Sequence, residues 1–201
     1  MKKIELHTPI SEDNVRKLNV GDHVFLSGTI ITARDSAHRR MMKYIAEKRS
    51  IPFPLEGMAL YHCGPLVKAH GDEWLVLAAG PTTSMRMEPF EAEIIENLGV
   101  RLIIGKGGMG ERTTEACKKY GAVYCAFVGG AAVLAANAIK RVKGVEWLDL
   151  GMPEALWIFE VENFGPLIVT IDSHGNNLHR EVMSRVEANR DTIYKKLRLE
   201  G

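Results

Sequence analysis

The chain has 201 residues, 46% hydrophobic and 25% charged, which is the composition of a globular protein able to bury a core. Its formal net charge of +1 provides no overall field for nucleic acid or a membrane surface, so we expect neither as a partner. No stretch reaches the roughly 18 apolar residues of a membrane span, and the first residues lack the apolar segment of a signal peptide. We therefore expect a cytoplasmic protein.

The three cysteines are Cys63, Cys117 and Cys125. Their number and spacing match no disulfide framework and no zinc or ferredoxin pattern. We expect small core residues, with at most one exposed thiol.

In chain order, the first feature is an amphipathic polar stretch at 11–18. We then expect a strand at 23–32, a helix at 34–47 and a short strand at 59–63. A hairpin of strands at 65–68 and 74–79 follows. Strands and helices then alternate. The further strands are expected at 101–104, 122–128, 156–161 and 167–171, and the helices at 89–98, 111–120, 131–142 and 177–197. An antiparallel-looking first third followed by βα units predicts a layered α/β fold, in a single domain over residues 1–201.

Two glycine-rich polar turns follow the strands at 74–79 and 101–104, and each leads into a helix. They read Gly80-Pro81-Thr82-Thr83-Ser84-Met85-Arg86-Met87 and Gly105-Lys106-Gly107-Gly108-Met109-Gly110. We expect both strands in one sheet, so that Thr82, Arg86 and Lys106 meet at the end where open α/β sheets bind ligands. Hydroxyls, cations and free amides together predict a pocket for a small anion, and a carboxylate fits best.

The second turn satisfies the GxGxxG pattern of dinucleotide-binding folds. However, the strand at 122–128 ends in Gly129-Gly130 instead of the acidic residue that binds a ribose, and no Gly-Lys-Ser/Thr of a Walker loop follows. Glycines still let backbone amides approach an anion, and the following helix N-terminus and Lys106 would attract it. The alternative is a tight connection that needs glycine for its backbone angles.

Three further segments each have two interpretations. The hydroxyls at 82–84 either cap a helix or bind the ligand. In the segment at 34–40, one interpretation is that Asp35 caps the helix at 34–47. The other is that the segment brings Arg34 to the anion, with His38 on the same helix face as Arg34. The polar stretch at 171–179 is either an Asx-type turn or presents His174 as a proton carrier.

Together and in this order, the segments resemble the β subunit of two-subunit class I hydro-lyases, the iron–sulfur fumarate hydratases and L(+)-tartrate dehydratases, and the C-terminal domain of single-chain class I fumarases. The resemblance covers nearly the whole chain. It is carried by residues 27–29 and 34–40, by His62-Cys63-Gly64-Pro65, by the two glycine-rich turns and by residues 172–178. It implies a swivelling β/β/α domain like the mobile domain of aconitase. It also implies a [4Fe-4S] cluster ligated by cysteines of a larger α subunit, with no metal ligand in this chain.

Matched motif by motif, the resemblance implies a clamp for a small dicarboxylate. Arg34, Arg86 and Lys106 would neutralise its carboxylates, a task that suits the planar guanidinium. His38 and Gly107 would also contact the substrate.

The same resemblance implies that Thr82 is the base that removes the proton from C3 of malate. A hydroxyl does so only if its pKa is strongly depressed, and nearby cations act in that direction. Asp35, Thr83 and His174 would lie behind these residues.

We therefore expect the β subunit of a fumarate hydratase, a lyase of the tricarboxylic acid cycle that interconverts fumarate and (S)-malate and is active only with its α subunit in a hetero-oligomer. When the chain is isolated from its α subunit, a homodimer is compatible with this expectation. The close alternative is the L(+)-tartrate dehydratase β subunit, which forms oxaloacetate. Two other classes remain open: a non-catalytic anion-binding module and an NAD-dependent oxidoreductase, the latter disfavoured because no acidic ribose partner is present.

Overall fold

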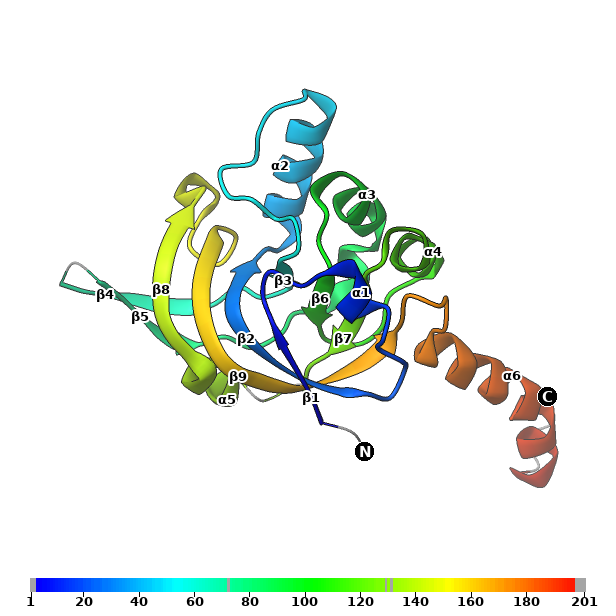
Figure 1. Cartoon of the computed structure of the whole chain (residues 1–201). Helices are drawn as coiled ribbons and strands as arrows, with labels where there is room; N and C mark the ends of the chain where they lie inside the picture. The colour runs from blue at the N-terminus through cyan, green and yellow to red at the C-terminus, as the bar shows by residue number, and fades with distance from the viewer. Residues whose placement is uncertain (1–2, 72, 129, 131, 198–201) are drawn as a thin grey trace.

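The computed structural model describes residues 3–71, 73–128, 130 and 132–197. The strands of the main sheet are β1 (Lys3–His7), β2 (His23–Thr32), β3 (Ala59–Tyr61), β6 (Leu102–Gly105), β7 (Val123–Ala126), β8 (Ile139–Glu146) and β9 (Leu156–Ile171). They are ordered β1-β2-β3-β6-β7-β9-β8, and β2 also pairs with β9. That additional pairing closes β2, β3, β6, β7 and β9 into a ring, while β4 (Leu66–His70) and β5 (Glu73–Ala78) form a separate hairpin (Figure 1).

The apolar residues of the ring strands are buried on both faces, as expected for uninterrupted apolar runs. In β6, Leu102 and Ile104 belong to a cluster that receives residues from every ring strand, whereas Ile103 belongs to a second cluster. This second cluster lies against α2 (Asp35–Ala46), α3 (Glu88–Leu98) and α4 (Glu111–Tyr120), which cover one outer side of the ring (Figure 1). The ring therefore has a core inside it and another beneath these helices.

The remaining helical elements are short or peripheral. They are α1 (Glu12–Val15), α5 (Ala132–Ala138), α6 (Leu178–Leu197) and the 3₁₀ turns η1 (Ser84–Arg86) and η2 (Leu148–Leu150). α6 projects away from the ring (Figure 1). No helix in the described ranges is long and apolar enough to cross a membrane.

Several predicted elements are confirmed. The strand at 23–32 and the helix at 111–120 have the expected bounds, and the helices at 34–47 and 89–98 differ by one residue at one or both ends. Gly99 and Gly121 adopt the left-handed conformation just after α3 and α4, with φ of 67° and 69°, which ends each helix as glycine commonly does.

Other predictions about the sheet are wrong. β5 does not join the main sheet, although β4 and β5 pair antiparallel and so confirm the expected hairpin. The rest of the first third is not antiparallel, because β1, β2 and β3 run parallel. The two strands expected at 156–161 and 167–171 are one long strand, β9. It continues because β2 pairs with it on both sides of an irregular stretch, with register shifts where β2 passes Leu26.

The helix expected at 131–142 is also wrong in its second half. α5 ends at Ala138, and the chain from Ile139 on pairs with β9 as β8. The alanines that favour a helix lie at or before Ala138, whereas Ile139–Glu146 contains no alanine and pairs as a strand. Residues 72, 129 and 131, which fall in the expected hairpin turn, glycine pair and helix start, lie outside the described residues.

Candidate active site

The two glycine-rich turns are joined by backbone hydrogen bonds at the end of β3 and β6. Thr82 N–H donates to the His62 carbonyl at 2.7 Å, and Lys106 N–H donates to the Thr82 carbonyl at 3.1 Å. Ser84 N–H in turn donates to the Lys106 carbonyl at 3.0 Å. Thr82 and Lys106 are therefore neighbours as predicted, but through this ladder and not because β5 belongs to the main sheet.

Arg86 is held by the first residue of α2. Its Nε and Nη2 donate to the two carboxylate oxygens of Asp35 at 3.1 and 2.8 Å, and Nη2 also lies 3.3 Å from the Thr82 hydroxyl oxygen. Partial burial raises the pKa of Asp35, but hydrogen bonds from its own backbone amide and from Arg86 outweigh burial, so the net pKa lies below its usual value. Asp35 is thus an anionic support for Arg86 and not a helix cap, since the N-cap of α2 is Arg34.

Arg34 is the residue just before α2, and its side chain has two carboxylate neighbours, Glu154 and Asp35. Its Nε is 3.3 Å from Glu154 Oε1, and the other oxygen of Glu154 accepts the Ser36 amide at 2.8 Å. A Cβ at Gly64 would come within 2.6 Å of the Arg34 guanidinium, so glycine is needed there to admit this side chain. Arg34 and Arg86 therefore share the Asp35 carboxylate, since Arg34 Nε lies 3.9 Å and Arg86 Nη2 lies 2.8 Å from its Oδ2. Arg34 has Glu154 as a further partner.

The three hydroxyls at 82–84 do not cap a helix. Thr83 is the N-cap of η1 without a side-chain cap bond, and it is exposed. Ser84 is buried and bonds to His62 and Tyr124, whereas Thr82 is partly exposed beside Arg86. The capping interpretation is wrong, and Thr82 is the hydroxyl placed next to a cation.

The N-terminus of α4 is already occupied by a carboxylate of the chain. Glu88 accepts the Gly110 amide at 2.7 Å, the Thr113 amide at 3.3 Å and the Thr113 hydroxyl at 2.6 Å. Two of the amides at this helix N-terminus are therefore taken by Glu88, whose negative charge opposes the binding of a second anion there. A dinucleotide pyrophosphate would need the same amides, which removes the structural basis of the NAD hypothesis.

Lys106 and Gly107 remain available in the second turn. Both are exposed, and among the residues that the structure describes Lys106 Nζ has no ion-pair partner. Gly107 has φ of +78°, and a Cβ there would meet open space, so its conformation and not crowding requires glycine. Its carbonyl accepts from the Tyr124 hydroxyl at 3.0 Å, which fixes the turn to β7.

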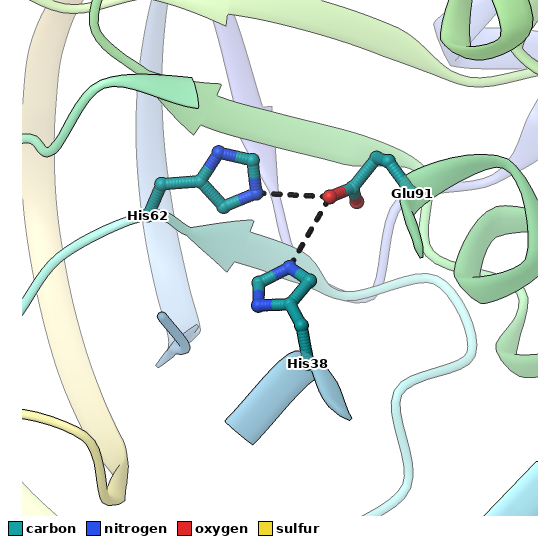
Figure 2. Close-up of side chains that lie close together, drawn as sticks. All are labelled: His38, His62 and Glu91. Carbon is teal, nitrogen blue, oxygen red and sulfur yellow. Dashed lines mark hydrogen bonds and ion pairs between the residues drawn. The ribbon is translucent and has the colours of Figure 1, made fainter. Parts of the chain in front are cut away.

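Beneath these residues lies a group that we call the buried triad: His38, Glu91 and His62. All three side chains have no exposed surface. Glu91 Oε2 lies 3.2 Å from His38 Nε2 and 3.0 Å from His62 Nε2 (Figure 2). His38 Nδ1 faces the Arg34 carbonyl at 2.7 Å, and His62 Nδ1 faces Ser84 Oγ at 2.9 Å. The predicted role of His38 in direct substrate contact needs correction, because its ring is enclosed and both nitrogens are engaged.

The triad holds a carboxylate that is charged despite its burial. Burial alone raises the pKa of Glu91, but the two imidazoles outweigh it and lower the pKa to about 2. Burial lowers the pKa of His62, against the opposing effect of Glu91, so His62 is neutral. The negative charge of Glu91 is therefore stabilised by N–H donors in a site that water does not reach.

The triad also has the donor types of a metal site, with one ligand atom from each residue within 4.8 Å of the others. Both Nε2 atoms, however, are directed at the same oxygen of Glu91 (Figure 2). That oxygen occupies the point on which the ring lone pairs would converge in a metal site. We therefore treat the triad as hydrogen-bonded.

His174 is not brought to this group. It is exposed in a turn where Asp172 accepts the amides of His174 and Asn176, as the Asx-turn interpretation predicted. The next residue, Gly175, lies against Lys118 near the C-terminal end of α4, whereas the Lys106 turn precedes the start of α4.

His179 is the histidine that lies against the glycine-rich turn. A Cβ at Gly108 would come within 2.6 Å of its ring. Asn177 holds the same turn by donating to the Met109 carbonyl at 3.1 Å.

Sequence reasoning missed Glu91, Glu88 and Glu154, and assigned no role to His62. A signal for Glu91 existed: it lies four residues after Met87 and three and four before Ile94 and Ile95, which places a carboxylate on the buried stripe of α3. No comparable pattern marks Glu154, which follows η2 far along the chain.

The cysteines of this chain do not fit an iron–sulfur cluster. All three are free and fully buried, so the exposed thiol that we allowed is not found among them. Burial raises the pKa of Cys63 to about 12, and it also raises the pKa of Cys117 and Cys125. Thiolates are the ligands of such clusters, and these thiols are held in the protonated form.

The chain is similar in sequence to several known proteins. The family model described as "Fumarase C-terminus" matches residues 1–182. The L(+)-tartrate dehydratase subunit beta of Escherichia coli K12 is 49% identical over 98% of this chain and 96% of its own length. A putative L(+)-tartrate dehydratase subunit beta of Methanocaldococcus jannaschii is 47% identical over 88% of this chain and 91% of its own. A putative class I fumarate hydratase of Geobacillus stearothermophilus is 45% identical over 89% of this chain, which corresponds to 34% of that longer protein.

Proposed function

The chain belongs to the fumarase C-terminus family, and from that premise we propose that it is the β subunit of a two-subunit hydro-lyase acting on a four-carbon dicarboxylate. The reaction that we favour is the interconversion of fumarate and (S)-malate. The relatives named as tartrate dehydratase subunits support the second candidate, the dehydration of L(+)-tartrate to oxaloacetate. The two substrates share two carboxylates, which is the feature that a pair of cationic anchors recognises.

The observation that carries the proposal is the position of Arg86 between Asp35 and the Thr82 hydroxyl. Asp35 takes Nε and one hydrogen of Nη2, which fixes the guanidinium plane, and among the described residues Nη1 makes no hydrogen bond. Nη1 is thus free to donate to a substrate carboxylate, and Lys106 supplies a second, mobile charge. Arg34, whose Nε lies 3.9 Å from the same Asp35 carboxylate, completes the clamp.

Thr82 is proposed as the base. In the dehydration direction Thr82, as the alkoxide, takes the proton from the carbon next to one carboxylate and becomes the neutral hydroxyl. Hydroxide leaves the neighbouring carbon and takes up a proton from a donor that we propose on the partner subunit, so that malate becomes fumarate and water. The bond from Arg86 Nη2 stabilises a negatively charged oxygen on Thr82 relative to the neutral hydroxyl. Lys106 and Arg86 stabilise the extra charge that the substrate carboxylate gains as the C–H bond breaks.

We propose that the [4Fe-4S] cluster belongs to a partner α subunit, since the thiols of this chain do not suit it. When bound, such a cluster supplies a Lewis acid for the substrate hydroxyl and carboxylate. The present chain would close over it as a single swivelling domain like the mobile domain of aconitase, in a cytoplasmic hetero-oligomer.

The test is to co-express this chain with the α-type subunit encoded beside it, purify the complex without oxygen, and assay fumarate and L(+)-tartrate in parallel. Turnover of either substrate by the complex, and none by the chain alone, is the expected result. A complex that retains iron and turns over neither substrate would contradict the proposal.

A further inference from the structure

We propose that Glu91, through His38 and His62, is a positioning residue that fixes the three segments carrying the substrate clamp at a set spacing. The proposal rests on the proposed function for its kinetic consequences, whereas the proton arrangement described below stands on the geometry of the chain itself.

The first step is the proton count at His38. A backbone carbonyl only accepts, so His38 Nδ1, 2.7 Å from the Arg34 carbonyl, carries a proton. The contact of 3.2 Å between His38 Nε2 and Glu91 Oε2 needs a second proton between the two atoms. This proton belongs to the imidazole, because His38 and His62 both contact Oε2 and together lower the pKa of Glu91 to about 2, so that Glu91 is the carboxylate. His38 is therefore an imidazolium paired with the Glu91 carboxylate.

The second step follows the chain of bonds beyond His62. With its Nε2 proton donated to Glu91, a neutral His62 accepts at Nδ1, so the Ser84 hydroxyl donates to it at 2.9 Å. The Tyr124 hydroxyl lies 3.0 Å from both Ser84 Oγ and the Gly107 carbonyl, and its one proton serves these two acceptors. Because the Ser84 proton is given to His62, the Tyr124 proton is shared between Ser84 Oγ and the Gly107 carbonyl, and these contacts link the Arg34 carbonyl to the Gly107 carbonyl.

The third step is the charge balance. One imidazolium, one carboxylate and one neutral imidazole sum to zero, which is the state that a fully buried group can adopt at least cost. Glu91 Oε1 is buried and has no hydrogen-bond partner among the described residues, so the carboxylate depends on its two histidine donors. Removing Glu91 leaves His38 without a counter-ion and His62 without an acceptor.

The fourth step connects the triad to the clamp. One end bonds the backbone of Arg34, where α2 begins. His62 accepts the Thr82 amide through its own carbonyl, and the far end bonds the carbonyl of Gly107, next to Lys106. A carboxylate supplied by α3 therefore sets the relative positions of the segments at Arg34, Thr82 and Lys106, which are separated by 48 and 24 residues in the chain, without touching the substrate.

The proton arrangement is tested on the full-length chain by the ¹⁵N and ¹H signals of its imidazole rings, assigned with His38→Gln and His62→Gln. We expect both ring nitrogens of His38 to be protonated at neutral pH and only Nε2 of His62. In Glu91→Gln, the Nε2 proton of His38 should be lost. A His38 ring with a bare Nε2 in the unsubstituted chain would overturn the proposal.

The positioning role is tested with Glu91→Ala, Glu91→Gln and the control Glu96→Gln on the exposed side of α3. We expect the backbone amide signals of Thr82, Ser84 and Lys106 to shift in Glu91→Ala and to stay in place in the control. In the assembled enzyme, kcat should fall about a hundredfold in Glu91→Ala, as misplacement by about an ångström does, with a much smaller change in KM. Glu91→Gln, which keeps a donor and an acceptor, should lose about tenfold or less.

The two experiments separate the two proposals. If the complex turns over neither substrate, the hydro-lyase proposal fails while the imidazole and amide signals still decide the role of Glu91. A folded Glu91→Ala chain with unshifted amides at Thr82 and Lys106, or an assembled variant with the kcat of the unsubstituted enzyme, would refute the positioning role. Should Glu91→Ala not fold, the Glu91→Gln variant provides the same readouts.

Discussion

Asp35 and Arg86 are joined by two parallel hydrogen bonds of 3.1 and 2.8 Å across a distance of 51 residues in the chain. The pair fixes the plane of a guanidinium whose Nη2 also reaches the Thr82 hydroxyl oxygen. The N-terminus of α2 and the turn that follows β5 are thereby fastened together, and the cation is aimed before any substrate arrives. Preorganisation of this kind is what electrostatic catalysis requires.

Asp35→Asn should lower kcat/KM of the assembled enzyme about tenfold, because an amide nitrogen then faces one of the Arg86 donors and the plane is no longer fixed. The matched control is Asp149→Asn. Asp149 accepts two similar hydrogen bonds, at 2.8 and 2.6 Å, from Arg40, which belongs to α2 as Asp35 does. Arg40 is not one of the clamp residues. Equal kinetic losses in both variants would mean that only the stability of α2 is involved.

The buried triad predicts that the chain loses stability as pH falls. The pKa of Glu91 is about 2 in the folded chain against 4.5 for the free group, so its contribution is complete above pH 4.5 and is lost as pH falls toward 2. The pKa of His62 lies below 6.5 in the folded chain, so its contribution is complete above pH 6.5 and declines as the unfolded chain takes up a proton below it. Both effects lower the free energy of unfolding as pH falls.

Urea unfolding at a series of pH values measures this dependence. The difference in free energy of unfolding between the unsubstituted chain and Glu91→Gln should shrink as pH falls from 4.5 toward 2. Glu96→Gln serves as the control on the exposed side of α3. A difference for Glu91→Gln that stays constant with pH would contradict a charged, hydrogen-bonded Glu91.

Thr82→Ser and Thr82→Val test the chemical role of the hydroxyl in the assembled enzyme. Serine keeps the oxygen beside Arg86, so kcat should stay within about tenfold of the unsubstituted enzyme, whereas valine should lose about a hundredfold or more. Valine has nearly the shape of threonine, so it leaves the packing of the turn largely unchanged. Equal kcat values for the two variants would exclude Thr82 as the base.

Gly105→Ala should destabilise the fold, because the added Cβ would lie 1.8 Å from Ser84 Oγ, which is buried and bonded to His62 and Tyr124. The expected loss is about 1–3 kcal/mol in the free energy of unfolding. The matched control is Gly144→Ala in β8, where the nearest atom to the added Cβ is 3.6 Å away. A thermal midpoint for Gly105→Ala no lower than that of the control would show that Ser84 can move aside.

The sequence reasoning succeeded where local patterns decide structure. Alternation predicted β2, and glycine stops predicted the ends of α3 and α4. It failed where distant pairing decides. No strand was predicted at 162–166, but pairing with β2 continues β9 through these residues. Pairing with β9 likewise makes the chain from Ile139 on a strand, β8.

The candidate site shows the same division. The residues with recognisable motifs, Thr82, Arg86 and Lys106, were found, although the route that brings them together was not. Their carboxylate partners were only partly found, since Asp35 lies in a motif but Glu91 and Glu154 do not. A carboxylate that acts through burial or through a contact across the chain carries no local pattern to reveal it.

The most direct test of the clamp is Lys106→Ala in the complex with its partner, with Lys68→Ala in the β4–β5 hairpin as the control. We predict that kcat/KM for the dicarboxylate falls about a hundredfold, or roughly 2.7 kcal/mol, in Lys106→Ala and stays within about twofold in the control, with both chains folded. A folded Lys106→Ala complex with unchanged kcat/KM would contradict the central claim that the second glycine-rich turn supplies a charge to the substrate.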